Sequence, residues 1–237
     1  MILSGAGLSA ESGISTFRKE HDSLWENYDV MEVCSTQGWI KNRKLVTDFY
    51  NKRRKELASK EPNHAHKVLV QLEQEYRGRI IHLTQNVDDL LERAGAKDII
   101  HLHGTLTDLR CEACTLTFPI GYAEQTEKDI CPHCGNSRIR HNVVMFGETA
   151  PEYAQLKQAM RHASLFIAIG TSGNVIDIVE IAKAFKHSIL IDPKRQLTKS
   201  KFDPKDYIDE YFEHYLPNKA TEAMDETLLL IKEHMGS

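Results

Sequence analysis

The sequence predicts an α/β protein with a doubly wound parallel sheet and a small metal-binding insert. Short apolar runs, which indicate buried strands, alternate with stretches whose apolar residues repeat at helical spacing. Alternating strands and helices favour a parallel sheet, because each crossover helix returns the chain to the same end of the sheet. Two Cys-x-x-Cys pairs interrupt this alternation and mark the insert.

The bulk composition limits the class of protein. With 237 residues, the chain is long enough for one large α/β domain that carries a small insert. Hydrophobic content of 41% and charged content of 27% are ordinary for a soluble globular protein, and a net charge of −4 gives no reason to expect nucleic-acid binding. No apolar run approaches the roughly 20 residues that span a bilayer, and no signal-peptide pattern opens the chain, so we expect no membrane association.

The chain begins with a strand and a glycine-rich turn. Residues 1–4 end a predicted strand and run into Gly5-Ala6-Gly7-Leu8-Ser9-Ala10, which fits the Gly-x-Gly-x-x-(Gly/Ala) dinucleotide pattern. The first glycine allows the tight turn, the second lets the backbone approach a pyrophosphate, and the small third residue permits close helix packing. The helix that follows ends early at Gly13, and Thr16-Phe17-Arg18 stands where a second strand would be expected. We therefore predict a Rossmann-like sheet with an unusual first crossover.

The segment from 24 to 61 is rich in aromatic and charged residues. It contains a helix whose apolar residues fall at helical spacing: Val46, Phe49, Tyr50 and Leu57. Taken alone, Tyr50 and Arg53 indicate an amphipathic helix with one packed aromatic and a solvated basic face. A second amphipathic helix is predicted over 63–76, with Asn63 at its start and Gly78 after its end.

Polar residues follow the next two predicted strands at their carboxyl ends. The strand at 80–83 leads to Gln85, Asn86 and Asp88, and a helix over 88–93 is ended by Gly95. A short strand at 99–102 then delivers His103 to the same end of the sheet. Because ligands of open α/β sheets bind outside the carboxyl ends of the strands, we predict a site built from an amide, a carboxylate and an imidazole.

The four paired cysteines have the spacing of a zinc ribbon. Cys111 and Cys114 are separated by sixteen residues from Cys131 and Cys134. Four thiolates leave no open position on the metal, so one structural Zn²⁺ is predicted. His133 or His141 could replace a cysteine. The competing interpretations of the two pairs are a redox role and thiols that bind no metal. Metal-bound thiolates indicate a reducing compartment and therefore a cytoplasmic protein. The fifth cysteine, Cys34, is expected to be a packed thiol.

The second half of the chain continues the alternation of strands and helices. A strand at 142–151 ends in a loop, and the strand at 165–169 leads into Gly170-Thr171-Ser172-Gly173, a second candidate cradle for phosphate or ribose. The remaining predicted elements are helices at 153–163, 175–185 and 220–234 and a strand at 188–191 that ends at Asp192.

These motifs, in this order from residue 5 to about residue 192, resemble those of the sirtuins, the NAD-dependent protein-lysine deacylases. The residues from Gly5 to Arg18 match the first cofactor motif of that family, and Thr84-Gln85-Asn86-x-Asp88 matches the second. His103-Gly104 matches the catalytic histidine, Phe146-Gly147-Glu148 the peptide-binding strand, and Gly170-Thr171-Ser172 the third cofactor motif. The resemblance implies a Rossmann-like domain and a zinc domain, with NAD and an acyl-lysine peptide entering the cleft between them.

The resemblance also implies roles for individual residues. Those assigned to NAD are Gly5, Ala6, Gly7, Ser9, Ala10, Thr16, Phe17, Arg18, Trp25, Gln85, Asn86, Val87, Asp88, Gly170, Thr171, Ser172, Asp192 and Ala220. Those assigned to the acyl-lysine peptide are Tyr50, Arg53, Phe146, Gly147, Glu148, Gly173, Asn174 and Val175. The implied domains are a NAD-binding part at 1–27, 77–106 and 142–237, a helical part with the acyl pocket at 28–76, and a zinc module at 107–141.

In the implied mechanism, the acyl oxygen attacks the nicotinamide ribose, nicotinamide leaves and an O-alkylimidate forms. His103 is the general base that deprotonates the ribose hydroxyls, a task that suits a side chain whose pKa is near working pH. The products are free lysine, nicotinamide and O-acyl-ADP-ribose. Tyr50-Asn51-Lys52-Arg53 matches the Tyr-x-x-Arg of the branch that removes succinyl and malonyl groups, and Ala10-Glu11-Ser12-Gly13 is also typical of that branch. We therefore expect succinyl and malonyl groups to be removed faster than acetyl groups.

The chain departs from the common sirtuin pattern at a few positions. Met145 stands where Trp is common, Asp89 where Gly is frequent and Asp177-Ile178 where Pro-Ala is frequent. Asp192 stands where many members have an Asn that contacts the adenosine ribose, a contact that a carboxylate can also make. Two other functions stay open from the residues. One is NAD hydrolysis or ADP-ribosyl transfer on the same scaffold, against which Tyr50 and Arg53 argue. The other is an NAD-sensing module without activity, against which His103 argues.

Overall fold

The computed structural model describes residues 1–15, 28–76, 78–199 and 205–236. The predicted site residues Thr16, Phe17, Arg18 and Trp25 lie outside the described residues. Among the helices that the described residues form, none is long and apolar enough to cross a bilayer.

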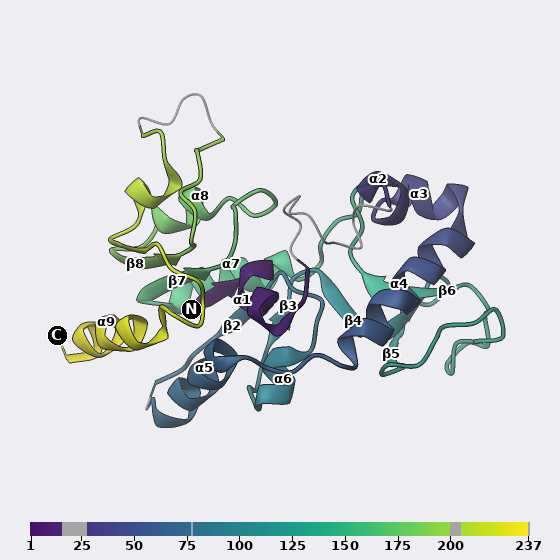
Figure 1. Ribbon diagram of the computed structural model, residues 1–237. Helices are drawn as coiled ribbons and strands as arrows, with labels where there is room; N and C mark the ends of the chain where they lie inside the picture. The colour runs from purple at the N-terminus through teal and green to yellow at the C-terminus, as the bar shows by residue number, and fades with distance from the viewer. Residues whose placement is uncertain (16–27, 77, 200–204, 237) are drawn as a thin grey trace.

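The main sheet has six parallel strands in the order β3-β2-β1-β7-β8-β9. Figure 1 shows its neighbouring strands β7 and β8 side by side. Its strands are β1 (Ile2–Ser4), β2 (His82–Thr84), β3 (Ile100–His101), β7 (Leu165–Ile169), β8 (His187–Ile191) and β9 (His214–Leu216). Numbered along the sheet's own chain order, this is the 3-2-1-4-5-6 arrangement of dinucleotide-binding folds. The prediction of a Rossmann-like, doubly wound parallel sheet is confirmed.

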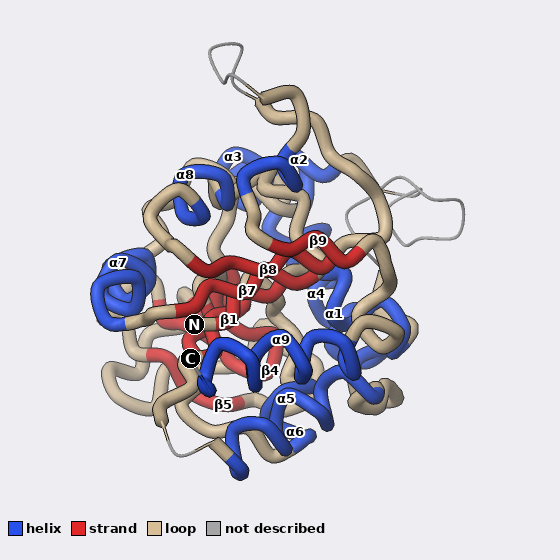
Figure 2. The backbone as a smooth tube through the Cα atoms, turned by 90° about the vertical axis from the view of Figure 1, so that its left-hand side faces the viewer, coloured by secondary structure: helices blue, strands red, loops and turns tan. Residues whose placement is uncertain are grey.

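Helices cover both faces of this sheet (Figure 2). One face packs against α7 (Tyr153–His162), α8 (Ile178–Ala182) and the 3₁₀ turn η3 (Ile208–Tyr211). The other face packs against α1 (Ala6–Ser9), α5 (His64–Glu75), α6 (Leu90–Ala94) and α9 (Met224–Gly236). Successive strand residues point to opposite faces, so Leu3 joins the first core and Ile2 the second. Burial on both faces explains why the central strand β7 is wholly apolar.

A second, antiparallel sheet of three strands stands beside the main one. It consists of β4 (Gly104–Cys111), β5 (Thr117–Pro119) and β6 (Ile139–Val143), with β4 in the middle. The helices α2 (Val30–Val33), α3 (Thr36–Lys41) and α4 (Arg43–Leu57) pack against it through a shared apolar core. The buried Arg54 fixes α4 to β4, because its Nε donates to the carbonyl of Leu106 at 2.6 Å.

Local capping explains where several helices begin and end. Asn63 caps α5 through a reciprocal capping box with His66, as the sequence predicts. Gly95 adopts a φ of 105° after α6, and Gly13 a φ of 78° after the 3₁₀ turn η1 (Ala10–Ser12), which ends the first helical segment early. The side chain of Asp177 accepts from the backbone of Val179 and Glu180, so α8 begins only at Ile178.

Some predicted elements differ from the structure. The strand expected at 142–151 is β6, which begins at Ile139 and ends at Val143, since its partner β4 pairs with it only that far. The helix expected over 175–185 is α8, which begins at Ile178 because of the Asp177 cap and ends at Ala182. The last helix starts at Met224 instead of residue 220. The strand β9 was not predicted, because three residues with two half-buried side chains give no clear period.

Candidate active site

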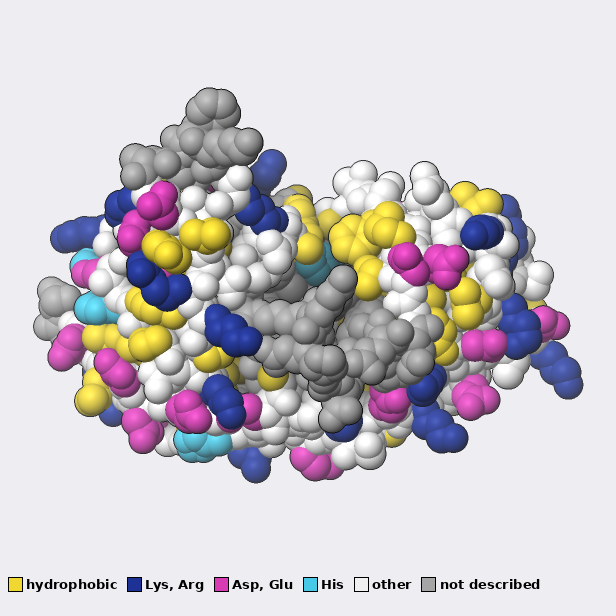
Figure 3. Space-filling view, turned by 45° about the horizontal axis from the view of Figure 1, so that its top comes forward, with side chains coloured by type: hydrophobic (Ala, Val, Ile, Leu, Met, Phe, Trp, Pro, Cys, Tyr) yellow, Lys and Arg dark blue, Asp and Glu magenta, His cyan; other side chains and the backbone are white. Residues whose placement is uncertain are grey.

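A large cavity lies at the carboxyl edge of the main sheet, between that sheet and the helices and strands of the smaller one. Its volume is about 840 Å³. Figure 3 shows the molecule hollowed between two lobes, with hydrophobic side chains gathered beside the hollow. Loops after β1, β2, β3, β7 and β8 supply one wall, and α4 with the segment after β6 supplies the other. The position matches the crevice in which open α/β sheets bind ligands.

Most of the predicted site residues line this one cavity. They are Gly5, Ala6, Gly7, Ala10, Tyr50, Arg53, Gln85, Asn86, Val87, Asp88, His103, Phe146, Gly147, Glu148, Gly170, Thr171, Ser172, Asn174, Val175, Asp192 and Ala220. Ser9 and Gly173 are buried and do not line it. Residues that are far apart in the sequence therefore come together at one site.

Two glycine turns meet where the strand order reverses, between β1 and β7. The amide of Gly7 donates to the carbonyl of Gly170 at 2.9 Å. A Cβ on Gly7 would lie 2.5 Å from the Cα of Gly170, and one on Gly5 would lie 2.8 Å from the Gly170 carbonyl oxygen. Because both clashes involve backbone atoms, only glycine fits at these positions, and the bare backbone is left facing the cavity.

Gln85, Asn86 and Asp88 project from the loop after β2. The Gln85 amide donates to the Thr171 hydroxyl at 2.8 Å and so connects the second and third predicted cofactor motifs. The Asn86 amide donates to the Ser9 hydroxyl at 3.2 Å. Asp88 is buried, and burial raises the pKa of its carboxyl group. Gln85 and Asn86 are thus held by contacts with segments distant in the sequence.

A buried polar network behind Asn86 was missed by the sequence interpretation. His66 Nε2 lies 3.4 Å from the Ser9 hydroxyl, and His66 Nδ1 lies 2.9 Å from the side-chain oxygen of Asn63. Asn63 in turn donates to the carbonyl of Leu8 at 2.8 Å. Burial lowers the pKa of His66 to about 4, so this histidine is neutral at pH 7. The network fixes Asn86 against the glycine turn. Of His66 and Asn63, only Asn63 has a signal in the sequence, as a helix cap.

His103 stands at the end of β3 with both ring nitrogens engaged. Its Nδ1 lies 3.1 Å from the carbonyl oxygen of Gln85, and its Nε2 lies 3.0 Å from the hydroxyl of Tyr153. Because a carbonyl only accepts, Nδ1 carries the proton of the neutral ring and Nε2 holds the lone pair. Burial lowers the pKa of His103, against the opposing effect of the Gln85 carbonyl. The ring is therefore a neutral base that faces the cavity.

The opposite wall carries Tyr50 and Arg53, which lie three residues apart and therefore on one face of α4. The buried ring of Tyr50 stacks on His141 with centroids 3.7 Å apart, and its hydroxyl donates to the Cys34 thiol at 3.5 Å. Burial raises the pKa of Tyr50 well above its usual value, and the positive charge of Arg53 opposes this shift. Cys34 is therefore part of the cavity wall and accepts a hydrogen bond there, whereas the sequence predicts only a packed thiol.

The stretch after β6 forms one rim of the cavity. Phe146 donates its amide to the carbonyl of Cys34 at 2.8 Å, and its carbonyl accepts from Thr36 at 3.0 Å. Glu148 accepts from Arg140 at 2.6 Å and from the backbone of Met145 at 3.0 Å. These contacts hold the rim while leaving the Phe146 side chain 45% exposed.

The four paired cysteines converge at the far end of the small sheet. The sulfurs of Cys111, Cys114, Cys131 and Cys134 all lie within 4.8 Å of one another. The Cys111–Cys134 and Cys114–Cys131 distances are 3.7 and 3.6 Å. Tetrahedral zinc with four thiolates implies sulfur separations of about 3.8 Å, whereas a disulfide would need about 2 Å. The donor set fits one structural Zn²⁺. His141 is buried against Tyr50, so it is not a ligand of this cluster.

Zinc is expected to be required for folding of this region. The core around the cysteines is small, and zinc binding contributes on the order of 10 kcal/mol to such modules. Cys131→Ser should lose the metal and lower the melting temperature, while Cys34→Ser should keep one zinc per chain. Metal content by mass spectrometry and thermal unfolding test this. Full zinc occupancy with unchanged melting in Cys131→Ser would contradict the assignment.

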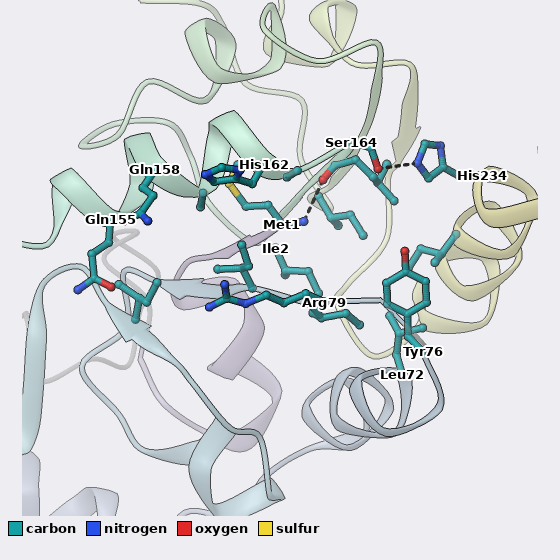
Figure 4. A pocket seen from close by; sticks show the side chains of 18 residues that line it. Met1, Ile2, Leu72, Tyr76, Arg79, Gln155, Gln158, His162, Ser164 and His234 are labelled. Carbon is teal, nitrogen blue, oxygen red and sulfur yellow. Dashed lines mark hydrogen bonds between the residues drawn. The ribbon is translucent and has the colours of Figure 1, made fainter.

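A second cavity, of about 340 Å³, lies at the amino-terminal edge of the main sheet (Figure 4). The amino group of Met1 donates to the carbonyl of Leu165 there at 3.0 Å, and His234 lies 3.2 Å from the Ser164 hydroxyl. This cavity is at the opposite end of the strands from the predicted site residues. The larger cavity is therefore the candidate active site.

Comparisons with known proteins agree with this site. A model of the Sir2 family matches residues 5–177. An NAD-dependent protein deacylase of Campylobacter jejuni is 50% identical over 210 residues, 89% of each chain. Among solved structures, a mutant Sir2 homologue in complex with ADP-ribose is similar, with a TM-score of 0.83, 34% identity, and coverage of 100% of this chain and 92% of that one. A Sir2 homologue in complex with NAD has a TM-score of 0.81 at 34% identity, covering 99% of this chain and 89% of the other.

The family model spans most of the chain, and its range contains the glycine turn, His103, the four cysteines and the rim at Phe146. The sequence identity and the structural similarity extend over nearly the whole length. This protein belongs to the Sir2 family.

Proposed function

We propose that the protein removes acyl groups from protein lysines with NAD as cosubstrate, and that it prefers the acidic succinyl and malonyl groups. The general activity, NAD-dependent protein deacylation, follows from family membership and from the curated relatives named for it. The acidic preference rests on one observation: Tyr50 and Arg53 line the same cavity as His103 and the glycine turns.

The glycine turns and the loop after β2 suit NAD. We assign the pyrophosphate to the bare backbone at Gly5 and Gly7, where a side chain would clash with Gly170. Gln85, Asn86 and Asp88 would hold the nicotinamide side and its ribose, while the buried carboxylate of Asp192 would take the adenosine ribose. Bound NAD supplies a ribose carbon that accepts the acyl oxygen and nicotinamide as the leaving group.

His103 would act as the general base. The carbonyl of Gln85 fixes the proton on Nδ1, so the lone pair of Nε2 faces the cavity and can accept a proton from a ribose hydroxyl. Burial keeps the ring neutral at pH 7, so it is available as a base before the reaction begins, and the proton that it accepts must leave the ring before the next turnover. The chain thus supplies a tethered base in a half-buried position.

This assignment predicts the pH dependence of the reaction. Only neutral His103 can accept the proton, and its pKa lies below the ordinary value of about 6.5 because burial disfavours the charged ring. The acid limb of the kcat/KM profile should therefore have its midpoint below pH 6.5. A pH profile of kcat/KM checks this, and an acid limb with its midpoint above 6.5 would contradict it.

The substrate peptide would bind as an added strand between two rims. One rim is Phe146-Gly147-Glu148 and the other is Gly173-Asn174-Val175, and the side chains of Phe146 and Val175 are 45% and 55% exposed. Pairing through the backbone gives affinity with little sequence selectivity, which suits an enzyme that acts on lysines in varied proteins.

The acyl group would enter toward α4. A guanidinium can bind a distal carboxylate through two parallel charge-assisted hydrogen bonds, and the Tyr50 hydroxyl can add a third. To donate to the acyl group, Tyr50 would exchange its weak bond to the Cys34 thiol for a charged acceptor. Charge-assisted bonds contribute roughly 1.5–3 kcal/mol, so kcat/KM should favour succinyl over acetyl peptide by roughly ten- to a hundredfold. An equal or higher kcat/KM for the acetyl peptide of the same sequence would contradict the proposed preference for acidic acyl groups.

We also propose a cytoplasmic setting for the enzyme. Thiolates that hold zinc require a reducing compartment, which supports a cytoplasmic location. The net charge of −4 gives no basis for nucleic-acid binding. We also propose that the chain divides as the family resemblance implies, into a NAD-binding part at 1–27, 77–106 and 142–237, a helical part at 28–76 and a zinc module at 107–141.

A further inference from the structure

We propose that Tyr153 occupies the catalytic lone pair of His103 in the unliganded protein and that the ribose hydroxyl of the cosubstrate must displace it. This inference rests on the proposed role of His103 as the base. It concerns a residue outside the predicted cofactor, substrate and metal sets, at the first turn of α7.

The geometry allows Nε2 of His103 to accept a hydrogen bond from only one donor at a time. Nδ1 lies 3.1 Å from the Gln85 carbonyl, which can only accept, so the neutral ring has its single lone pair on Nε2. The Tyr153 hydroxyl lies 3.0 Å from Nε2 and is the donor in this bond. Burial raises the pKa of Tyr153, so its hydroxyl keeps its proton at neutral pH.

A general base must lie within about 2.6–3.2 Å of the hydroxyl that it deprotonates. The Tyr153 oxygen already stands at that distance from Nε2, inside the same cavity. Two hydroxyl donors cannot share one lone pair, so the tyrosine and the ribose compete for it. Tyr153 therefore stands in for the ribose hydroxyl when the cavity is empty.

Displacement of Tyr153 should cost little beyond this hydrogen bond. The rings of His103 and Tyr153 are tilted by 44° with centroids 6.0 Å apart, so the two rings do not stack. Tyr153 is only half-buried, whereas His103 keeps its second tether at Gln85. The tyrosine turns away and the base stays in place.

The chain offers a direct test. Tyr153→Phe removes the hydroxyl and keeps the ring, so the cosubstrate no longer competes with it. A single net hydrogen bond corresponds to roughly two- to tenfold in affinity. We expect ADP-ribose to bind Tyr153→Phe more tightly by that factor in calorimetry, and the KM for NAD to fall with less than a twofold change in kcat. Tyr76→Phe, outside the larger cavity, is the matched control.

The outcomes separate this inference from the proposed function. Unchanged ADP-ribose affinity, or a fall in kcat with constant KM, would overturn the competition while leaving deacylation intact. Failure of the wild-type protein to bind ADP-ribose at all would instead count against the proposed function. Unfolding of Tyr153→Phe, detected as a lowered melting temperature, would overturn the inference by giving the Tyr153 hydroxyl a structural role.

Discussion

Replacing His103 by alanine is expected to lower the rate of deacylation by roughly a hundred- to ten-thousandfold, the usual contribution of a general base. His103→Tyr should be equally impaired, because a tyrosine hydroxyl is a much weaker base at pH 7. The fold should be retained, since the ring of His103 is only half-buried and, among the described residues, its side chain forms hydrogen bonds with Gln85 and Tyr153 alone. A direct assay of acyl-lysine consumption gives the rate.

His162→Ala provides the matched control, because this histidine is exposed at the end of α7 and lies outside the larger cavity. It should show the wild-type rate and melting temperature. If His103→Ala turned over at close to the wild-type rate, another group would have to be the base.

Arg53→Met should reduce kcat/KM for succinyl and malonyl peptides by roughly ten- to a hundredfold, with less than a threefold effect on acetyl peptide. Methionine keeps much of the apolar length of arginine but cannot bind a carboxylate. The acidic acyl group therefore loses its charge-assisted hydrogen bonds in this variant. Parallel assays on peptides of one sequence, differing only in the acyl group, measure the ratio.

Lys52→Met is the control for general effects of charge on α4. Lys52 is the adjacent residue and is exposed on the solvent side of the helix. The Lys52→Met variant should have the wild-type ratio of kcat/KM for succinyl peptide to kcat/KM for acetyl peptide. An equal loss on all acyl groups in Arg53→Met would make Arg53 a structural residue, and the proposed preference would lose its main support.

Features that depend on neighbours in sequence could be predicted from the chain alone. The apolar run at 165–169 is β7, and the glycine turn begins at the residue after β1. Asn63 caps its helix, and Gly95 ends the next one in the left-handed conformation. Each of these signals is local, since a cap, a turn or a strand face is determined by a few consecutive residues.

Features that depend on packing between distant segments could not be predicted from the sequence. Cys34 lies beside the Tyr50 hydroxyl because α2 and α4 fold against each other, and nothing in its own neighbourhood indicates this. His66 reaches Ser9 across 57 positions of sequence, and Tyr153 reaches His103 across 50. A histidine or tyrosine on an amphipathic helix gives no sign of such a partner, so only the folded chain revealed these contacts.

The central claim is that the cavity couples NAD consumption to removal of an acyl group from lysine. The most direct measurement is a single reaction of the protein with NAD and a succinyl-lysine peptide, with all products resolved by mass. We predict equal amounts of free lysine peptide, nicotinamide and O-succinyl-ADP-ribose. Three results would contradict the account. Free ADP-ribose with an unchanged peptide would indicate NAD hydrolysis, and ADP-ribosylated protein would indicate ADP-ribosyl transfer. No product at all would indicate an NAD-binding module without activity.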